Sequence, residues 1–370
     1  MSPLFTAVPH GCAAGHHLEV FKDVFLKRIQ RGYPPYSIHT LGAIHANLMM
    51  LHNFFKIPWK ETVPELTHEK DFLFGAVGVC LRALGHLNEA VPLFEGALDL
   101  DVAEKSWEGA AADSANLSEV HMARGDLVVS LKLANQAVKF ADITGHWFTR
   151  CYARTCRGTV FHQMARFAEA ITDFRDAEQI QIQNQPEFSV LYAYQGFRYS
   201  DLLLDLQQIS DAKKRALTGL SLAKMLNSLL SAGLDNLILA RASLMEAKAK
   251  QVANPSISDA FTLAVEGIRS AGIMDVLPLG LLARAEFFRF TREFSRSEKD
   301  LNEAFRIATR NGMNLHLIDY HLESARLRLA QGDKFRAREN YEIAKEKIDL
   351  MGYHRRNKEI TEIKKYLLSL

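Results

Sequence analysis

A pattern of small and aromatic residues recurs every forty residues along this chain. Its first clear copy, Leu84-Gly85-Leu87-Ala90-Phe94-Ala97, is followed by Arg124-Gly125-Leu127-Ser130-Ala134-Ala137 and then by Met164-Ala165-Phe167-Ala170-Phe174-Ala177. A fixed period of this size indicates repeated supersecondary units, each burying its apolar face against its neighbours. We therefore expect one repeat array from the 370 residues, and not the separate globular domains that the length alone would suggest.

Each repeat unit is predicted to be a helical hairpin. Small residues such as Ala90 and Ala170 suit positions where two helices cross closely, and Phe94 or Phe174 one turn later fills the next gap. Gly85, like Gly125 and Gly332, suits the short turn between the helices. Only ten prolines occur, and proline is the residue that a helix interior tolerates least. The expected fold class is all-α, with almost no β-structure.

The apolar periodicity divides the chain into expected elements. Helices are predicted at 3–13, 17–31, 36–55, 69–84, 87–101, 106–124, 127–143, 147–164, 167–183, 187–205, 209–227, 229–250, 256–271, 278–291, 295–311, 315–331, 334–350 and 356–369. Four regions follow: N-terminal hairpins over 1–68 with an irregular joint at 56–68, regular repeats over 69–185, variant longer repeats over 186–275, and C-terminal repeats with a capping helix over 276–370. The joint is expected because Pro58 and Pro64 interrupt helical structure.

The spacing of these small and aromatic residues resembles the tetratricopeptide repeat (TPR). The resemblance includes Ala-x-x-x-Phe or Tyr pairs and small residues within the first helices: Ala90/Phe94, Ala170/Phe174, Ala337/Tyr341, Gly78, Gly158, Ala285 and Ala325. The period departs from the family's thirty-four residues, and the closing proline is absent. Longer repeats of this type resemble the C-terminal sensor regions of bacterial STAND-type signal-transduction ATPases, as do the strings at 54–59, 114–119, 191–204, 280–285, 315–326 and 352–356.

The resemblance implies a right-handed α-solenoid whose first helices line a concave surface. Carried over position by position, the concave residues are Glu119, Tyr152, Thr155, Thr159, His162, Phe197, Asp201, Glu286, Arg289, Asp319 and Arg326. The implied function is non-enzymatic binding of a protein segment or small effector, as the sensor or scaffold arm of a bacterial signalling or defence system. A freestanding adaptor that bridges two proteins and an unrecognised enzyme on a helical frame are the alternatives.

Catalytic, metal-binding and nucleotide-binding motifs are absent from the sequence. It lacks the phosphate-binding glycine loops, the H-E-x-x-H zinc motif and the G-x-S-x-G hydrolase motif, so we expect no enzyme activity and no cofactor. The cluster of Cys12 with His10, His16 and His17 matches no usual zinc spacing, and we expect no metal. With 45 basic and 43 acidic residues, the charge balance does not favour nucleic acid.

The sequence also indicates where the protein is located and how its two ends are arranged. Four scattered cysteines, no apolar stretch long enough for a membrane helix and no signal-peptide pattern favour a cytoplasmic protein. The run Arg355-Arg356-Lys358 is expected to form a solvated face of the C-terminal cap. Residues 1–31 begin with apolar Leu4 and Val8 and no polar cap, so this end is expected to dock on another domain or subunit.

Overall fold

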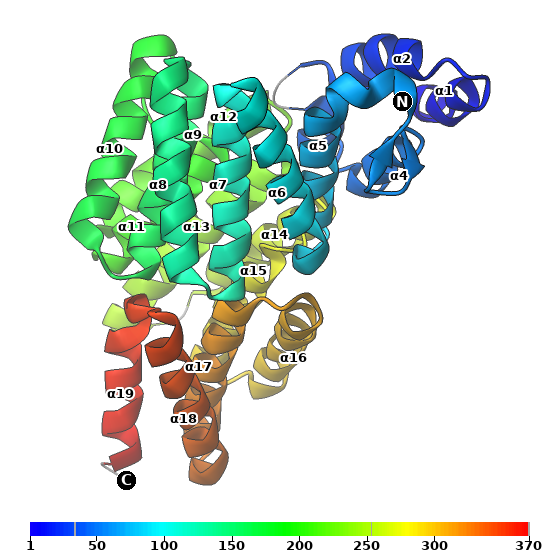
Figure 1. Ribbon diagram of the computed structural model, residues 1–370. Helices are drawn as coiled ribbons and strands as arrows, with labels where there is room; N and C mark the ends of the chain where they lie inside the picture. The colour runs from blue at the N-terminus through cyan, green and yellow to red at the C-terminus, as the bar shows by residue number, and fades with distance from the viewer. Residues whose placement is uncertain (33–34, 253, 369–370) are drawn as a thin grey trace.

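The computed structural model describes residues 1–32, 35–252 and 254–368 and consists almost entirely of helices in this part of the chain (Figure 1). The N-terminal elements are α1 (Ser2–Ala13), α2 (His17–Glu19), the π-helical η1 (Val20–Gln30), α3 (Tyr36–His39), α4 (Ile44–His52), β1 (Phe55–Ile57), β2 (Glu61–Thr62) and the 3₁₀ turn η2 (Pro64–Glu69). None of the described helices has the combined length and apolarity that crossing a membrane requires.

The hairpins begin after η2. Their helices are α5 (Lys70–Ala83), α6 (Leu87–Glu104), α7 (Trp107–Arg124), α8 (Leu127–Thr144), α9 (Trp147–Gln163), α10 (Phe167–Asn184), α11 (Ala193–Asp205), α12 (Ile209–Met225), α13 (Leu229–Lys250), α14 (Pro255–Ser270), α15 (Leu277–Phe290), α16 (Phe294–Asn311), α17 (Asn314–Ala330) and α18 (Lys334–Met351), followed by η3 (His354–Arg356) and α19 (Asn357–Leu368). The predicted all-α repeat fold is confirmed.

The hairpin geometry follows from the repeated small residues. Ala90 and Ala170 are fully buried between paired helices, and Ser130 occupies the equivalent position in the α7–α8 hairpin. The hydroxyls of Ser118 and Ser130 each donate to the other residue's backbone carbonyl oxygen, at 2.9 and 2.8 Å. Such bonds require the two backbones to approach closely, which a larger side chain would prevent. Gly85 supplies the left-handed conformation that the α5–α6 turn needs, with φ of 89°.

The predicted single helix over 36–55 is wrong at residues 40–43 and 53–55. The chain breaks between α3 and α4, and residues 55–62 form a two-stranded antiparallel hairpin that pairs Phe55 with Thr62. Pro58 follows directly after β1 and cannot continue the ladder. The Phe55 ring stacks on Phe74 of α5, with centroids 6.1 Å apart. The irregular joint expected at 56–68 therefore contains a small β-ribbon that packs on the first repeat helix.

The apolar face of the first helix is covered within the chain. Val8 and Cys12 of α1 are buried in one cluster with Phe21 and Phe25 of η1. The uncovered face that we expected at residues 1–31 is thus already packed, and docking of this end loses that support.

The superhelix closes on itself more tightly than an array in which hairpins contact only their neighbours. The amide of Asn314, at the start of α17, donates to the carbonyl of Arg124 at 2.8 Å, and the backbone N–H of Met274 donates to Ala83 at 2.7 Å. In Figure 1 the last hairpin and α19 lie below the turns of α7–α10. Loops far apart in sequence therefore form one seam between the two halves of the array.

Candidate functional site

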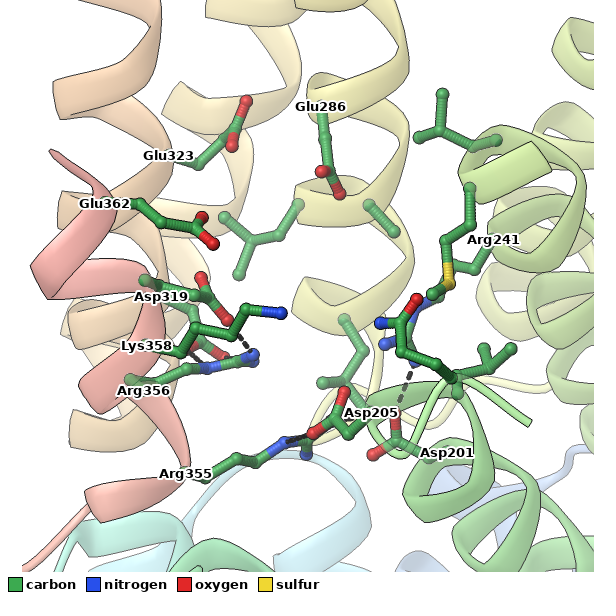
Figure 2. A pocket seen from close by; sticks show the side chains of 18 of the residues that line it. Asp201, Asp205, Arg241, Glu286, Asp319, Glu323, Arg355, Arg356, Lys358 and Glu362 are labelled. Carbon is green, nitrogen blue, oxygen red and sulfur yellow. Dashed lines mark hydrogen bonds and ion pairs between the residues drawn. The ribbon is translucent and has the colours of Figure 1, made fainter. Parts of the chain in front are cut away.

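A pocket of about 610 Å³ lies on the concave side of the second half of the array (Figure 2). Its walls are α11, α13, α15 and α17, which are successive first or long helices, together with the C-terminal segment from His354 to Glu362. Because these helices repeat at regular spacing, each presents side chains to the same space. The volume lies in the range of about 300 to 1,000 Å³ that is typical of ligand pockets.

The pocket has an apolar floor. Phe197 of α11, Leu237 and Leu244 of α13 and Leu282 of α15 contribute to its surface, and each is at most 8% exposed. The same side chains belong to the main hydrophobic core, so the repeat packing holds the floor in place.

The charged walls are nearly balanced. Seven carboxylates and six Lys or Arg residues line the pocket: Asp201, Asp205, Glu286, Asp319, Glu323, Glu359 and Glu362 with Arg241, Lys248, Arg326, Arg355, Arg356 and Lys358. Most are paired across neighbouring repeats. Lys248 of α13 binds Glu286 of α15, and Arg326 of α17 binds Glu359 of α19 at 2.7 Å. Burial opposes ionisation of Glu286, but Lys248 and Arg289 outweigh it and hold its pKa well below the usual value.

Two adjacent arginines of the C-terminal segment reach opposite walls of the pocket. Arg355 binds Asp201 and Asp205 of α11, at 2.8 and 2.5 Å, whereas Arg356 donates to both carboxylate oxygens of Asp319 in α17 through Nε and Nη2, at 2.8 and 3.1 Å. The Arg355 side chain is only 5% exposed. The predicted solvated face is therefore wrong for Arg355 and Arg356, because the array curves enough to bring acidic residues of α11 and α17 against them. Lys358 is exposed and points into the pocket (Figure 2).

Asp201 and Asp205 form a shared acidic seat at the end of α11. Asp201 also binds Arg241 of α13 at 2.5 Å, and Asp205 accepts from Nε2 of His162 at 2.9 Å. Burial disfavours both carboxylates, yet Arg355 overcomes this and lowers the pKa of each well below its usual range. Burial lowers the pKa of His162, and the nearby Arg355 charge lowers it further. The seat therefore holds two carboxylates, two guanidinium groups and a neutral imidazole.

The predicted concave residues divide into two groups. Five line the pocket: Phe197, Asp201, Glu286, Asp319 and Arg326. His162 and Arg289 lie directly behind it, because His162 bonds to Asp205 and Arg289 binds Glu323 at 2.5 Å. The other four, Glu119, Tyr152, Thr155 and Thr159, are in the first half of the array and do not line the pocket.

The four remaining residues are engaged in local contacts. Glu119 is 7% exposed and lies between Arg82 and Arg198, whose Nη2 is 3.0 Å from the carboxylate. The hydroxyls of Thr155 and Thr159 donate to carbonyls within α9. Asp275, from the loop before α15, approaches Arg82 at 3.9 Å and thus brings the second half of the array against this cluster.

Arg241 and the C-terminal arginines were missed as site residues by sequence reasoning. A usable signal was the spacing of Asp201 and Asp205, which places two carboxylates on one helix face and requires a basic partner. Nothing in the spacing indicated that the partner would be Arg355, which lies 150 residues or more away. Among the described residues, no group of His, Cys, Asp and Glu is arranged to hold a metal ion.

The chain is similar in fold to solved structures but not in sequence to known families. The chain matches no family model, and no curated protein is similar in sequence. Among solved structures it is similar to the Rap protein complexed with competence and sporulation factor, with a TM-score of 0.54, 10% identity, and 90% of this chain and 96% of that chain covered. The chain has a TPR-like repeat fold. At this identity the likeness concerns the fold alone.

Two further solved structures are more distant. Aspartyl phosphate phosphatase F from Bacillus subtilis gives a TM-score of 0.48 at 12% identity, covering 89% of this chain and 88% of that one. A tetratricopeptide repeat protein from Parabacteroides merdae gives 0.40 at 16% identity, covering 81% of this chain and 99% of that one.

Proposed function

We propose that this protein is a non-enzymatic interaction module that binds an extended segment of a partner protein, or a peptide, in the pocket between α11 and α19. The observation that carries the proposal is the pocket itself: an apolar floor bordered by charged side chains from the first helices of four successive hairpins. An extended peptide presents apolar and charged side chains at a regular spacing, so it can contact several repeats at once.

The charge arrangement supports a peptide more than a compact apolar ligand. Both signs of charge line the walls, and their ion pairs connect neighbouring helices. A ligand with charged groups of its own can replace such partners, whereas a purely apolar ligand would remove water from these charged groups without any compensating contact. The Rap protein of the comparison was solved in complex with competence and sporulation factor, which adds support for ligand binding by this type of scaffold.

We also propose a sensor or scaffold arm of a bacterial signalling or defence system as the wider role. Its support is the resemblance of the strings at 54–59, 191–204 and 315–326 to the repeat regions of STAND-type proteins.

A library selection tests the binding function. The wild-type chain, immobilised, is expected to enrich specific sequences from a phage-displayed library of random peptides. Ala283→Trp fills the pocket from α15 and should weaken binding of an enriched synthetic peptide at least about tenfold, since its indole occupies the ligand's space. Ala103→Trp is the matched control, because Ala103 is exposed on α6 outside the pocket. Failure to enrich any sequence, or equal affinity of the Ala283→Trp variant, would contradict the proposal.

A further inference from the structure

The C-terminal segment lies in the groove in the way that a bound peptide would. Residues 354–362 form one wall of the pocket, from which Arg355 pairs with α11 and Arg356 with α17. Both side chains are labelled in Figure 2. These two helices belong to different hairpins, so the segment joins walls that are not neighbours in sequence. Its basic side chains provide the principal contacts with them.

Apolar packing holds the C-terminal segment at two positions, Tyr353 before the pocket wall and Ile363 in α19, which belong to one core cluster. Residues 354–362, between these two positions, include no buried residue. Tyr366 and Leu368 are 62% and 73% exposed. The attachment to α11 and α17 therefore depends on ion pairs of Arg355, Arg356 and Glu359, which salt and competing charges can weaken.

The surface beneath the two arginines is acidic. Without Arg355 and Arg356, Asp201 and Asp205 would retain Arg241 and the imidazole of His162, and Asp319 would retain only the uncharged hydroxyl of Tyr353 among the partners that bond to it in the described residues. One full positive charge would then face three negative charges. Because buried unpaired carboxylates are costly, this surface favours an incoming ligand with guanidinium or ammonium groups.

We propose that the groove selects arginine-containing segments of partner proteins, and that residues 354–359 of this chain occupy it as an intramolecular ligand of the same class. This inference rests on the proposed peptide-binding function and specifies the chemistry of the ligand. A partner binds by replacing Arg355 at Asp201 and Asp205 and Arg356 at Asp319. Since the internal segment is tethered, its effective concentration is high, and it lowers the apparent affinity of every competing segment.

The test uses the chain's own sequence as the probe. A fluorescent synthetic peptide of residues 352–362 is titrated into the full chain carrying Arg355→Ala and Arg356→Ala. We expect it to bind at least about tenfold more tightly than to the wild type, because the internal competitor is weakened. The control variant carries Lys364→Ala and Lys365→Ala, which remove the same charge from exposed positions of α19 and should bind like the wild type.

The probe and the receptor each have a matched negative version. A peptide with both arginines replaced by alanine should lose binding, as should the intact peptide when Asp201→Asn and Asp205→Asn are added to the double variant. Equal affinity of the double variant and the wild type, or undiminished binding of the alanine peptide, would overturn the inference.

A measurement on the wild-type chain covers the case in which the double variant fails to fold. Excess intact peptide should accelerate hydrogen exchange of backbone amides in residues 357–368, because it displaces the internal segment, and the alanine peptide should not. Unchanged exchange with both peptides would contradict displacement. If library peptides bind and are lost in Ala283→Trp but contain no basic residues, the peptide-binding function stands and this inference fails.

Discussion

At the scale of single residues, the buried charges differ in how they are compensated. Asp201 and Asp205 are ionised because arginines surround them, whereas Asp235 of α13 is 4% exposed and its Oδ2 has no hydrogen-bond partner among the described residues. Burial raises the pKa of Asp235 to about 8. The folded chain therefore holds a proton there at neutral pH, while the unfolded carboxyl, with a pKa of about 3.9, releases it. This contribution to stability is present below about pH 4 and is lost as pH rises toward 8.

Asp235→Asn removes this titration with little change in shape. The free energy of unfolding of the variant, relative to the wild type, should increase between pH 4 and pH 8 by up to about 1.4 kcal/mol for each pH unit. Urea denaturation at both pH values measures the difference, with the exposed Asp259→Asn as the control. A difference that is the same at both pH values would show that Asp235 is ionised in the folded chain.

At the scale of secondary-structure elements, the hairpins depend on close helix crossings. Ala90 and Ala170 lie between paired helices and are fully buried. Each is followed four residues later by a buried phenylalanine, Phe94 or Phe174. Ser130 fills the same place and adds hydroxyl bonds to the facing backbone. The small residues that recur with the forty-residue period therefore mark the positions at which the backbones of the two helices of a hairpin approach closely.

Ala170→Leu tests this packing. The larger side chain should force α9 and α10 apart and lower the free energy of unfolding by roughly 1 to 3 kcal/mol. Lys364→Ala, at an exposed position of α19, should change it by less than about 0.5 kcal/mol. Chemical denaturation of both variants gives the comparison, and equal effects would show that Ala170 is not at a helix crossing.

At the scale of the whole molecule, the seam between the two halves sets the shape. The side chain of Met351, at the end of α18, packs against Gly125 in the α7–α8 turn, and Asn314 bonds to the carbonyl of Arg124 beside it. Gly125 has a φ of 89° and no Cβ, which leaves room for the methionine sulfur. These contacts hold the C-terminal repeats and the pocket wall against the first repeats.

Met351→Asp should loosen the seam, because it places a charge in an apolar contact. We expect a larger radius of gyration by small-angle X-ray scattering and faster hydrogen exchange in α18 and α19, while helix content by circular dichroism stays unchanged. Leu350→Asp is the matched control, since Leu350 is the preceding residue and is 78% exposed. An identical scattering curve for Met351→Asp and the wild type would remove the seam as a determinant of the shape.

The sequence by itself determined the repeat architecture, because helix crossings, turns and apolar stripes are local features with a fixed spacing. Helix boundaries followed closely where a small residue or Gly85 marked a turn. They failed at 36–55, where the chain breaks at residues 40–43 and Phe55 joins a β-ribbon that packs on Phe74, and at 187–205, where the helix begins only at Ala193. Five of the concave residues, including Asp201 and Asp319, line the pocket because the repeat register fixes which side they face.

Only the tertiary structure decided which part of the concave surface stays open. Small rotations between successive hairpins accumulate along the array, and no local pattern records their sum. That sum brings Asp275 to Arg82 of the first half, and it carries Arg355 to Asp201 and Asp205 in the second half. The pairing partner of each buried charge therefore depends on contacts between residues far apart in the chain, which spacing within single repeats cannot specify.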